Sequence, residues 1–150
     1  MNDAGVRPFS IRALLEDRAR YLVPMYQRNY AWGEGEITQL LQDVLDYQQK
    51  LVSGKGPQTC YIGTLVVFAR DDGSFEVIDG QQRFTTLSLL ANWLKHHAID
   101  SVDMSWYQTI NLAFESRPIS SHTFERLWQG VAPDDLRGST FTEGLVKGFA

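Results

Sequence analysis

Hydrophobic positions recur with a helical period in two long stretches of the chain. Residues 34–51 carry apolar side chains at i, i+3, i+4 and i+7, with one polar exception at Gln48, and this predicts an amphipathic helix. A run at 53–57 that contains glycine and proline ends it. A second helix is predicted at 80–97. Its buried face is expected to consist of Phe84, Leu87, Leu90, Ala91 and Leu94.

Shorter elements follow from β-forming residues and turn residues. Runs at 60–69 and 75–78, separated by a turn at 70–74, predict a β-hairpin. A short extended piece is predicted at 21–25, and Pro24 places it at a sheet edge or at a strand end. The other expected elements are helices at 11–18, 103–114, 123–129 and 142–149, and a polar, aromatic loop at 26–32.

Composition then narrows the class of protein. With 43% hydrophobic residues among 150, the chain can build a real core, and one domain with an extension is expected. The net charge of −4 argues against duplex-DNA binding as the sole activity, because such proteins carry a basic face. Cys60 is the only cysteine, which excludes an internal disulfide and suits the cytoplasm. The sequence shows no signal peptide and no apolar run of the ~20 residues that span a membrane.

The junction between the hairpin and the helix at 80–97 is the main candidate site. A helix start presents unpaired backbone N–H groups and the positive end of the helix dipole, and phosphate is the usual anion there. Arg83 in the first turn offers a bidentate phosphate contact, and Gly80 lets the backbone approach a phosphate closely. The hydroxyl of Thr85 is a further phosphate-binding candidate. The junction therefore predicts a site for a phosphorylated ligand, a nucleotide above all.

Three more polar residues at this junction are candidates for catalysis. Gln81 or Gln82 would orient a water molecule or a ligand edge, as a glutamine does in some nucleotide hydrolases. Asp79 would either cap the helix, with Gln82 three residues later completing a capping box, or hold Mg²⁺. The sequence does not separate these two roles. The simpler alternative is a helix cap followed by a surface turn, with no ligand.

A second candidate element lies at 24–32, where Tyr26, Gln27 and Arg28 interleave with further aromatic residues. Aromatic rings can stack on a base, and Arg28 can pair with a phosphate. The alternative is that Tyr30 and Trp32 pack on the following helix while Arg28 forms a surface ion pair.

The histidines and the cysteine of the chain do not suggest a further catalytic or metal-binding site. His96 and His97 are expected to act at the end of a helix, where cationic side chains favour the dipole. Cys60 is expected to be a small core residue of its strand. No cluster has the spacing of zinc ligands, and a magnesium role for Asp79 is the one metal expectation.

The order of these motifs resembles one family. Tyr-Gln-Arg-x-Tyr-x-Trp at 26–32 precedes an amphipathic helix, a Tyr-Ile-Gly-Thr-Leu strand at 61–65, and Ile-Asp-Gly-Gln-Gln-Arg-Phe-Thr-Thr-Leu at 78–87. The stretch from about Phe9 to Lys95 is similar to the GmrS-type domain of the GmrSD modification-dependent restriction enzymes of bacteria, which is related in fold to ParB and sulfiredoxin. The resemblance implies an α+β fold over 1–100, with a small mixed sheet and flanking helices. A mainly helical extension over 101–150 would begin a longer region.

The resemblance also implies a function. In relatives the box at this junction grips nucleotide phosphates, which carries over to Asp79, Gly80, Gln81, Gln82 and Arg83. The element Tyr26, Gln27 and Arg28 is expected on the opposite wall of the same pocket. Members bind or hydrolyse nucleoside triphosphates, GTP or another, with the need for Mg²⁺ left open.

The implied partners and the alternatives complete this expectation. Members accompany an HNH-type nuclease domain or subunit in defence against phage with modified DNA. No nuclease centre is visible in this chain, so DNA would be reached through that partner, and a homodimer is a further expectation. One alternative is a non-enzymatic sensor of the DNA backbone or of a modified nucleotide. The other is a structural scaffold in which the junction is only a cap.

Overall fold

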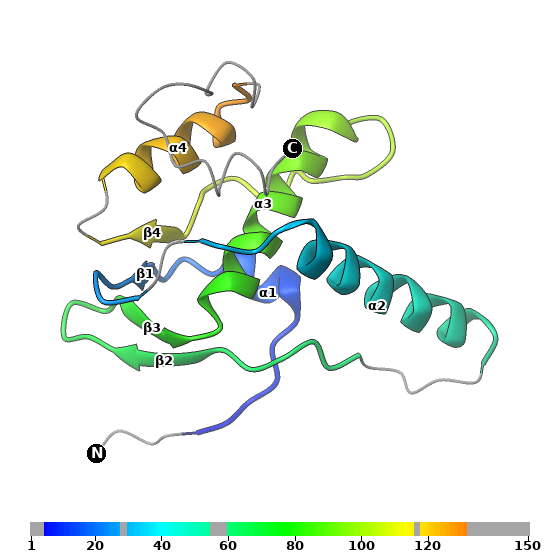
Figure 1. The fold of residues 1–150 in the computed structure, drawn as a ribbon, viewed down its shortest axis with the longest axis horizontal. Coiled ribbons are helices and arrows are strands. Elements are labelled where there is room, and N and C mark those ends of the chain that lie inside the picture. The colour runs from blue at the N-terminus through cyan, green and yellow to red at the C-terminus, as the bar shows by residue number, and fades with distance from the viewer. Residues whose placement is uncertain (1–4, 28–29, 55–59, 116–117, 132–150) are drawn as a thin grey trace.

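The computed structural model describes residues 5–27, 30–54, 60–115 and 118–131, without the side chains of 118–120. The chain builds a four-stranded sheet flanked by helices (Figure 1). In chain order the elements are α1 (Ile11–Glu16), β1 (Tyr21–Val23), α2 (Glu34–Val52), β2 (Val66–Ala69), β3 (Phe75–Asp79), α3 (Gln81–His97), β4 (Leu112–Phe114) and α4 (Pro118–Trp128). The expected α+β class, with a small mixed sheet and flanking helices, is confirmed.

The sheet is mixed because β1 lies inside it. The strand order is β2-β3-β1-β4. β1 runs parallel to β3 and β4, whereas β2 and β3 form the predicted antiparallel hairpin. Pro24 follows β1 directly, so its missing N–H falls at a strand end and not at an edge of the sheet.

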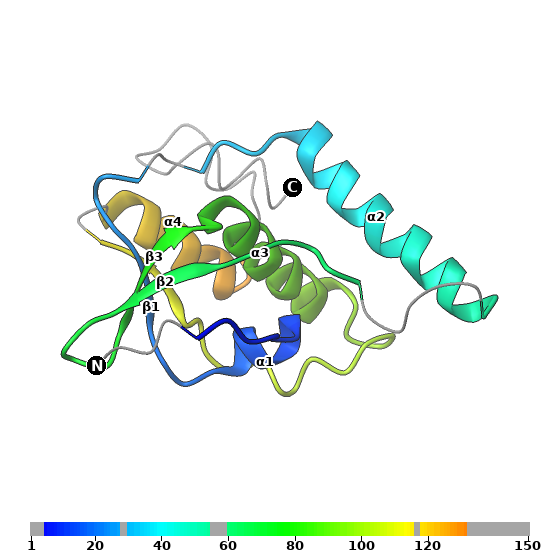
Figure 2. The same cartoon turned by 90° about the horizontal axis from the view of Figure 1, so that it is seen from below.

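α3 is the central helix of the core. The ring of Tyr21 in β1 stacks on Phe75 at 5.4 Å between centroids and meets Phe84 of α3 at 5.2 Å. α3 and α4 lie on the same side of the sheet (Figures 1 and 2), and Phe124 of α4 packs edge-on against Phe114 of β4. The buried core also includes Val23, Val77, Leu87, Leu89, Ala91, Tyr107, Leu112 and Leu127, while Leu90 and Leu94 are half-buried.

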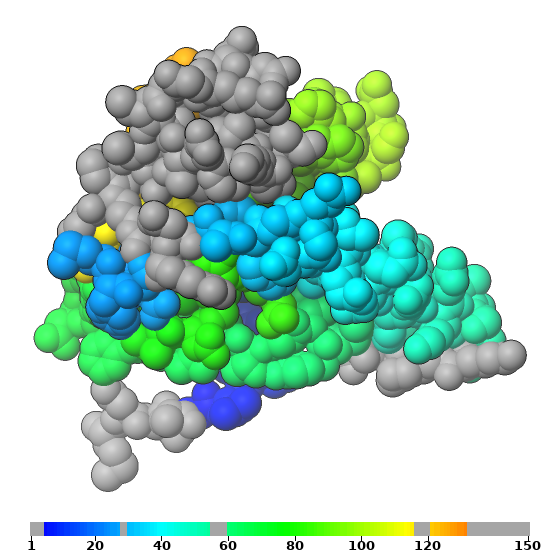
Figure 3. All heavy atoms as spheres, viewed as in Figure 1, coloured from blue at the N-terminus to red at the C-terminus, as the bar shows by residue number. Residues whose placement is uncertain are grey.

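α2 projects away from this core. It begins at Glu34 and ends at Val52, as the periodicity predicted to within one residue. Its far end stands clear of the sheet in both ribbon views (Figures 1 and 2), and most of its side chains are exposed at the molecular surface (Figure 3). Among the described residues, no helix has the length and the apolar character that crossing a membrane would take.

The helix predicted at 103–114 is wrong. Leu112–Phe114 forms β4 beside β1, with Leu112 and Phe114 buried and Ala113 half-buried between them. Three alternating residues are too short a run to outweigh a helical pattern. The part of the chain beyond residue 100 therefore supplies a strand to the sheet.

Two other boundaries differ from the prediction. The strand predicted at 60–69 forms only at Val66–Ala69, because β3 ends at Asp79 opposite Val66 and offers nothing earlier to pair with. Cys60 is therefore exposed and outside the strand, so its expected place in the core is wrong. α4 begins at Pro118, since proline is well suited to a first helical turn. The helix predicted at 142–149 lies outside the described residues.

Candidate functional site

A left-handed glycine joins β3 to α3. Gly80 has φ of +92°, a conformation that side chains disfavour. A Cβ on Gly80 would also lie 2.8 Å from the carbonyl oxygen of Thr64 and 3.3 Å from Cα of Leu65. Glycine is therefore required here by the chain's own packing. The close approach that Gly80 permits is to the segment before β2.

The predicted capping box is wrong. The N-cap of α3 is Gly80, which has no side chain to accept from the first turn. Asp79 lies one residue too early, and its Oδ1 accepts instead from the N–H of Gly80 at 2.9 Å. The left-handed turn at Gly80 causes this shift of the helix start. The first helical bond runs from the N–H of Phe84 to the carbonyl of Gly80 at 3.0 Å, and this N-cap glycine supplies no side-chain cap to the positive end of α3.

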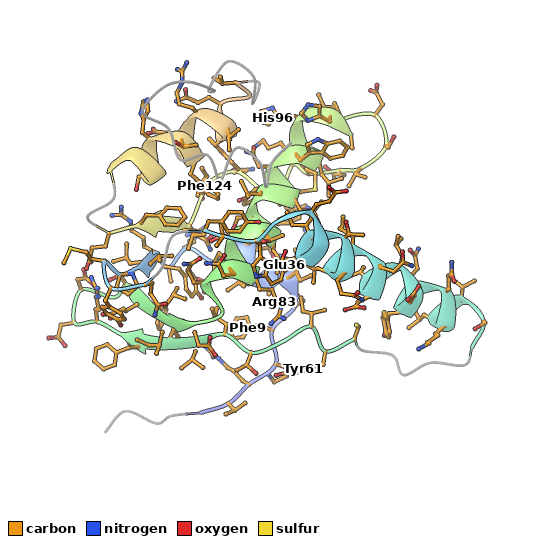
Figure 4. The ribbon with its side chains drawn as sticks, in the orientation of Figure 1. Phe9, Glu36, Tyr61, Arg83, His96 and Phe124 are labelled. Atoms are coloured by element: carbon orange, nitrogen blue, oxygen red, sulfur yellow. The ribbon has the colours of Figure 1, made fainter. Side chains whose placement is uncertain are left out.

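Arg83 lies in the first turn of α3, directly after this glycine cap. Its Cζ lies 5.8 Å from the ring centroid of Trp32, as in a cation–π contact. Figure 4 shows the side chain reaching from α3 toward the stretch before β2, where Gly63 leaves the space that the guanidinium fills. Its Nε is buried, and no described residue offers it a hydrogen-bond acceptor. Within the described part of the chain, no carboxylate forms an ion pair with Arg83.

A partly buried arginine with no carboxylate partner among the described residues indicates a binding site for an anion. Guanidinium groups that are partly buried are normally paired, because an unpaired buried charge or donor costs free energy. Arg83 instead lies over an aromatic ring and fills the space that the missing side chain of Gly63 leaves. Its remaining N–H donors, beside the positive end of α3, match a phosphate or carboxylate oxygen in charge and geometry.

Three consecutive residues fasten the loop before α2 to the start of α3. The hydroxyl of Tyr30 lies 2.8 Å from Thr86 Oγ1, and the N–H of Ala31 donates to Gln82 Oε1 at 2.8 Å. Trp32 then supplies the ring beneath Arg83. Tyr30 and Trp32 therefore both contact α3, the helix that follows the hairpin.

Gln81 and Gln82 also take part in the contact between the loop before α2 and the start of α3. Gln81 and Gln82 are only 4% and 8% exposed. Gln82 Nε2 donates to Gln81 Oε1 at 3.0 Å while its Oε1 receives the N–H of Ala31. Both side chains therefore position the loop over the helix start. Their orienting of a water molecule or a ligand edge stays a prediction.

Thr85 is turned inward. Its side chain is fully buried, and its hydroxyl donates to the carbonyl of Gln81 at 2.8 Å. Thr86 makes the same contact with the carbonyl of Gln82 at 2.8 Å. These hydroxyls stabilise the first two turns of α3 from within, and phosphate contact by Thr85 stays a prediction.

The element 24–27 is tied to β3. Gln27 Nε2 donates to the carbonyl of Ile78 at 2.8 Å, which brings Gln27 to the strand end that carries Asp79. The hydroxyl of Tyr26 donates to Glu76 Oε1 at 2.5 Å, although the Tyr26 side chain is exposed. Arg28 lies outside the described residues, so its expected position on the facing wall stays a prediction.

Glu76 is the centre of a charged network on the outer face of the sheet. Arg70 forms an ion pair with Glu76 at 3.0 Å and a second one with Glu115 at 2.5 Å. The hydrogen bond from Tyr26, followed by the contact with Arg70, lowers the pKa of the Glu76 carboxyl below its usual range. Tyr26 is thereby anchored to β3 and, through Arg70, to the residue after β4.

Sequence reasoning missed Gly63. A signal was present, since an isolated glycine in a run of β-forming residues often marks a close approach by another group. Gly63 has φ of +136°, and the approaching group is Arg83. The role of Trp32 in holding that arginine was likewise not foreseen.

The remaining candidates lie outside this site. His96, in the last turn of α3, bonds through Nε2 to the carbonyl of Trp128 at 2.7 Å, in keeping with its expected place at a helix end. Among the described residues, no group of three His, Cys, Asp or Glu side chains is placed to hold a metal ion. The magnesium role of Asp79 stays a prediction.

Comparison with protein families adds one match. The model of the family described as GmrSD restriction endonuclease, N-terminal domain, matches residues 11–143. The match covers every element of the sheet and the whole junction between β3 and α3. Comparison with curated proteins found no match.

Proposed function

Because the chain belongs to the GmrSD restriction endonuclease N-terminal domain family, we propose that it binds a nucleoside triphosphate by its phosphates at the start of α3. It would do so as the nucleotide-dependent domain of a bacterial restriction protein that acts in the cytoplasm against phage DNA. The chain itself supplies binding and regulation, and DNA cleavage falls to an HNH-type nuclease domain or subunit.

One observation carries this proposal. Arg83 presents a guanidinium, without a carboxylate partner among the described residues, at a helix start without a side-chain cap. The guanidinium lies over the ring of Trp32 and in the space that Gly63 leaves. A structural arginine would be expected to pair with an acid or with backbone carbonyls, whereas a phosphate-binding arginine needs its donors free before the ligand arrives.

The residues around Arg83 suit phosphoryl transfer, which depends on positioning and charge stabilisation. Arg83 would neutralise phosphate charge, with Arg28 as a second cation from the loop at 24–32. Asp79 would bind Mg²⁺ together with the phosphate oxygens, and the ion would supply further charge neutralisation. Gln81 would orient the attacking water, while Gln82 holds the loop through Ala31.

Thermal unfolding with Mg²⁺ and each of GTP, ATP, CTP and UTP tests the binding claim. A ligand that binds only the native state stabilises it by about 2.7 kcal/mol at a hundredfold excess over Kd. We expect one nucleotide to raise the melting temperature of the wild type and of Arg18→Ala, whose arginine is exposed and distant in sequence. Arg83→Ala should fold and lose the shift. Equal shifts in wild type and Arg83→Ala would remove the claim.

Two further measurements separate the alternatives. Release of inorganic phosphate from the stabilising nucleotide, absent in Arg83→Ala, would establish hydrolysis. If no nucleotide shifts the melting temperature, binding of modified and unmodified DNA at several salt concentrations tests the alternative that the chain is a DNA sensor. Binding through backbone phosphates would weaken steeply with salt and would not be displaced by free nucleotide.

A further inference from the structure

Three polar side chains of the core each carry a buried oxygen atom to which no described residue is hydrogen-bonded. Ser88 and Asn92 of α3 are 1% and 3% exposed, and Tyr107, in the loop between α3 and β4, is 1% exposed. The oxygens are Ser88 Oγ, Asn92 Oδ1 and Tyr107 Oη. Buried polar groups are normally paired, because an unpaired one costs free energy. Each of these oxygens therefore calls for a partner.

The side chain of Tyr107 lies along one face of α3. Ser88, Asn92 and Lys95 follow one another on this face at intervals of four and three residues. Lys95 Nζ donates to the backbone carbonyl of Tyr107 at 2.6 Å, which fixes one end of the tyrosine against α3. The ring of Tyr107 is held by an edge-on contact with Trp128 of α4, at 4.8 Å between centroids.

Ser88 shows where the other end of the tyrosine lies. Burial raises the pKa of the Tyr107 phenol, and the neighbouring hydroxyl of Ser88 opposes this rise. Tyr107 thus extends from Lys95 at its carbonyl to Ser88 at its hydroxyl, and Asn92 lies between these two positions along α3. The two hydroxyls are nevertheless not in direct hydrogen-bond geometry. A water molecule commonly bridges neighbouring polar groups of this kind.

α3 itself does not use these polar groups. The hydroxyls of Thr85 and Thr86 donate to helix carbonyls four residues earlier, both at 2.8 Å, whereas Ser88 Oγ makes no such bond. Asparagine has a low helix propensity, and Asn92 lies inside α3. Polar residues at two buried positions on one face of the helix therefore indicate a polar occupant beside them.

We propose that one internal water molecule lies between Ser88, Asn92 and Tyr107 and joins α3 to the loop before β4. The water accepts from the Tyr107 hydroxyl and donates to Asn92 Oδ1 and to Ser88 Oγ. Three bonds are typical of an internal water, and globular proteins hold on the order of one such molecule per 27 residues. All three side chains are uncharged, so the site suits a neutral molecule better than an ion.

A crystal structure of this chain, at a resolution that shows ordered water, tests the site directly. We expect one water oxygen within about 2.6–3.2 Å of Tyr107 Oη, Asn92 Oδ1 and Ser88 Oγ. A direct bond between the hydroxyls of Ser88 and Tyr107, without water density beside Asn92, would overturn the proposal.

Thermal unfolding of paired variants tests the water in solution. Tyr107→Phe and Asn92→Leu each remove one partner of the water, and each should lower the melting temperature by about 2–6 °C. The double variant should lose less than the sum of the two, because both side chains act through the same water. Tyr21→Phe is the matched control, since its hydroxyl bonds to Asp17 Oδ2 at 2.8 Å. Its loss should simply add to that of Asn92→Leu.

The pattern of coupling separates the water from a direct bond. A direct bond would couple Ser88→Ala with Tyr107→Phe and would leave Asn92→Leu additive with Tyr107→Phe. The shared water couples both pairs. Additive losses for Asn92→Leu and Tyr107→Phe would therefore exclude the proposed water.

Discussion

Gly63 lies directly against the guanidinium of Arg83. A Cβ on Gly63 would overlap Nη1 and would lie 2.8 Å from Cζ. The two residues come from different elements, since Gly63 precedes β2 and Arg83 lies in the first turn of α3. The glycine thus provides the space that the candidate phosphate-binding cation occupies.

Gly63→Ala should therefore displace Arg83 without removing it. Arginine is flexible, so the added methyl group moves the guanidinium before it moves the backbone. We expect nucleotide affinity to fall by about 10- to 100-fold, which corresponds to roughly 1.5–3 kcal/mol for lost charged hydrogen bonds. Isothermal titration calorimetry measures it. Gly73→Ala is the control, because Gly73 also has positive φ but has open space around it. Equal affinities in the two variants would show that Gly63 does not position Arg83.

Gly80→Ala should lower the free energy of unfolding of the protein even when no ligand is bound. Its Cβ would meet the backbone of Thr64 and Leu65, which cannot rotate away, and φ of +92° adds strain of about 1–2 kcal/mol. We expect the free energy of unfolding in urea to fall by about 2–4 kcal/mol, against about 1–2 kcal/mol for Gly73→Ala. A difference of less than about 0.5 kcal/mol between the variants would contradict the close approach at Gly80.

The contact between Tyr30 and Thr86 has a defined direction. The single hydroxyl proton of Thr86 goes to the carbonyl of Gln82, so the proton between the two side chains must come from Tyr30. Thr86→Val leaves the buried Tyr30 hydroxyl without its acceptor and should cost about 1–3 kcal/mol. Tyr30→Phe removes the donor and should cost about 0.5–1.5 kcal/mol. Urea unfolding gives both values, and the double variant Tyr30→Phe/Thr86→Val should be more stable than the sum predicts. If the stability losses of the two single variants simply add up in the double variant, the two hydroxyl groups do not interact.

The network around Glu76 should give the protein part of its acid sensitivity. The fold lowers the pKa of Glu76 below the usual 4.5, so its contribution to stability is present above that value. It is lost as the pH falls from about 4.5 through the lower value in the folded state. Glu76→Gln should lower the urea midpoint at pH 7 and lose less on going to pH 3 than the wild type does. Glu125→Gln, on the exposed surface of α4, should follow the wild type. A pH profile of Glu76→Gln parallel to that of the wild type would refute this role.

Elements with a local pattern could be predicted from the amino-acid sequence alone. The 3.6-residue period placed the helices at 34–52 and 81–97 to within a residue, and the turn at 70–74 placed the hairpin. The ordered motifs also pointed to the family that the comparison then matched. Arg83 was found as a candidate because its place after Gly80 can be read along one stretch of chain. The relation to the ParB and sulfiredoxin fold stays a prediction.

Features that depend on a neighbour far away in the sequence could be found only in the folded chain. β4 is a strand because β1 lies beside it, and the strand before Val66 is lost because β3 has already ended. Asp79 does not cap α3 because Gly80 adopts positive φ where the chain passes Thr64. Likewise, Trp32 and Gly63 reach Arg83 across separations that no local periodicity encodes. A sequence pattern predicts which face of a helix or strand is apolar. Whether another element packs on that face depends on the tertiary structure, and in α2 much of the apolar face is exposed.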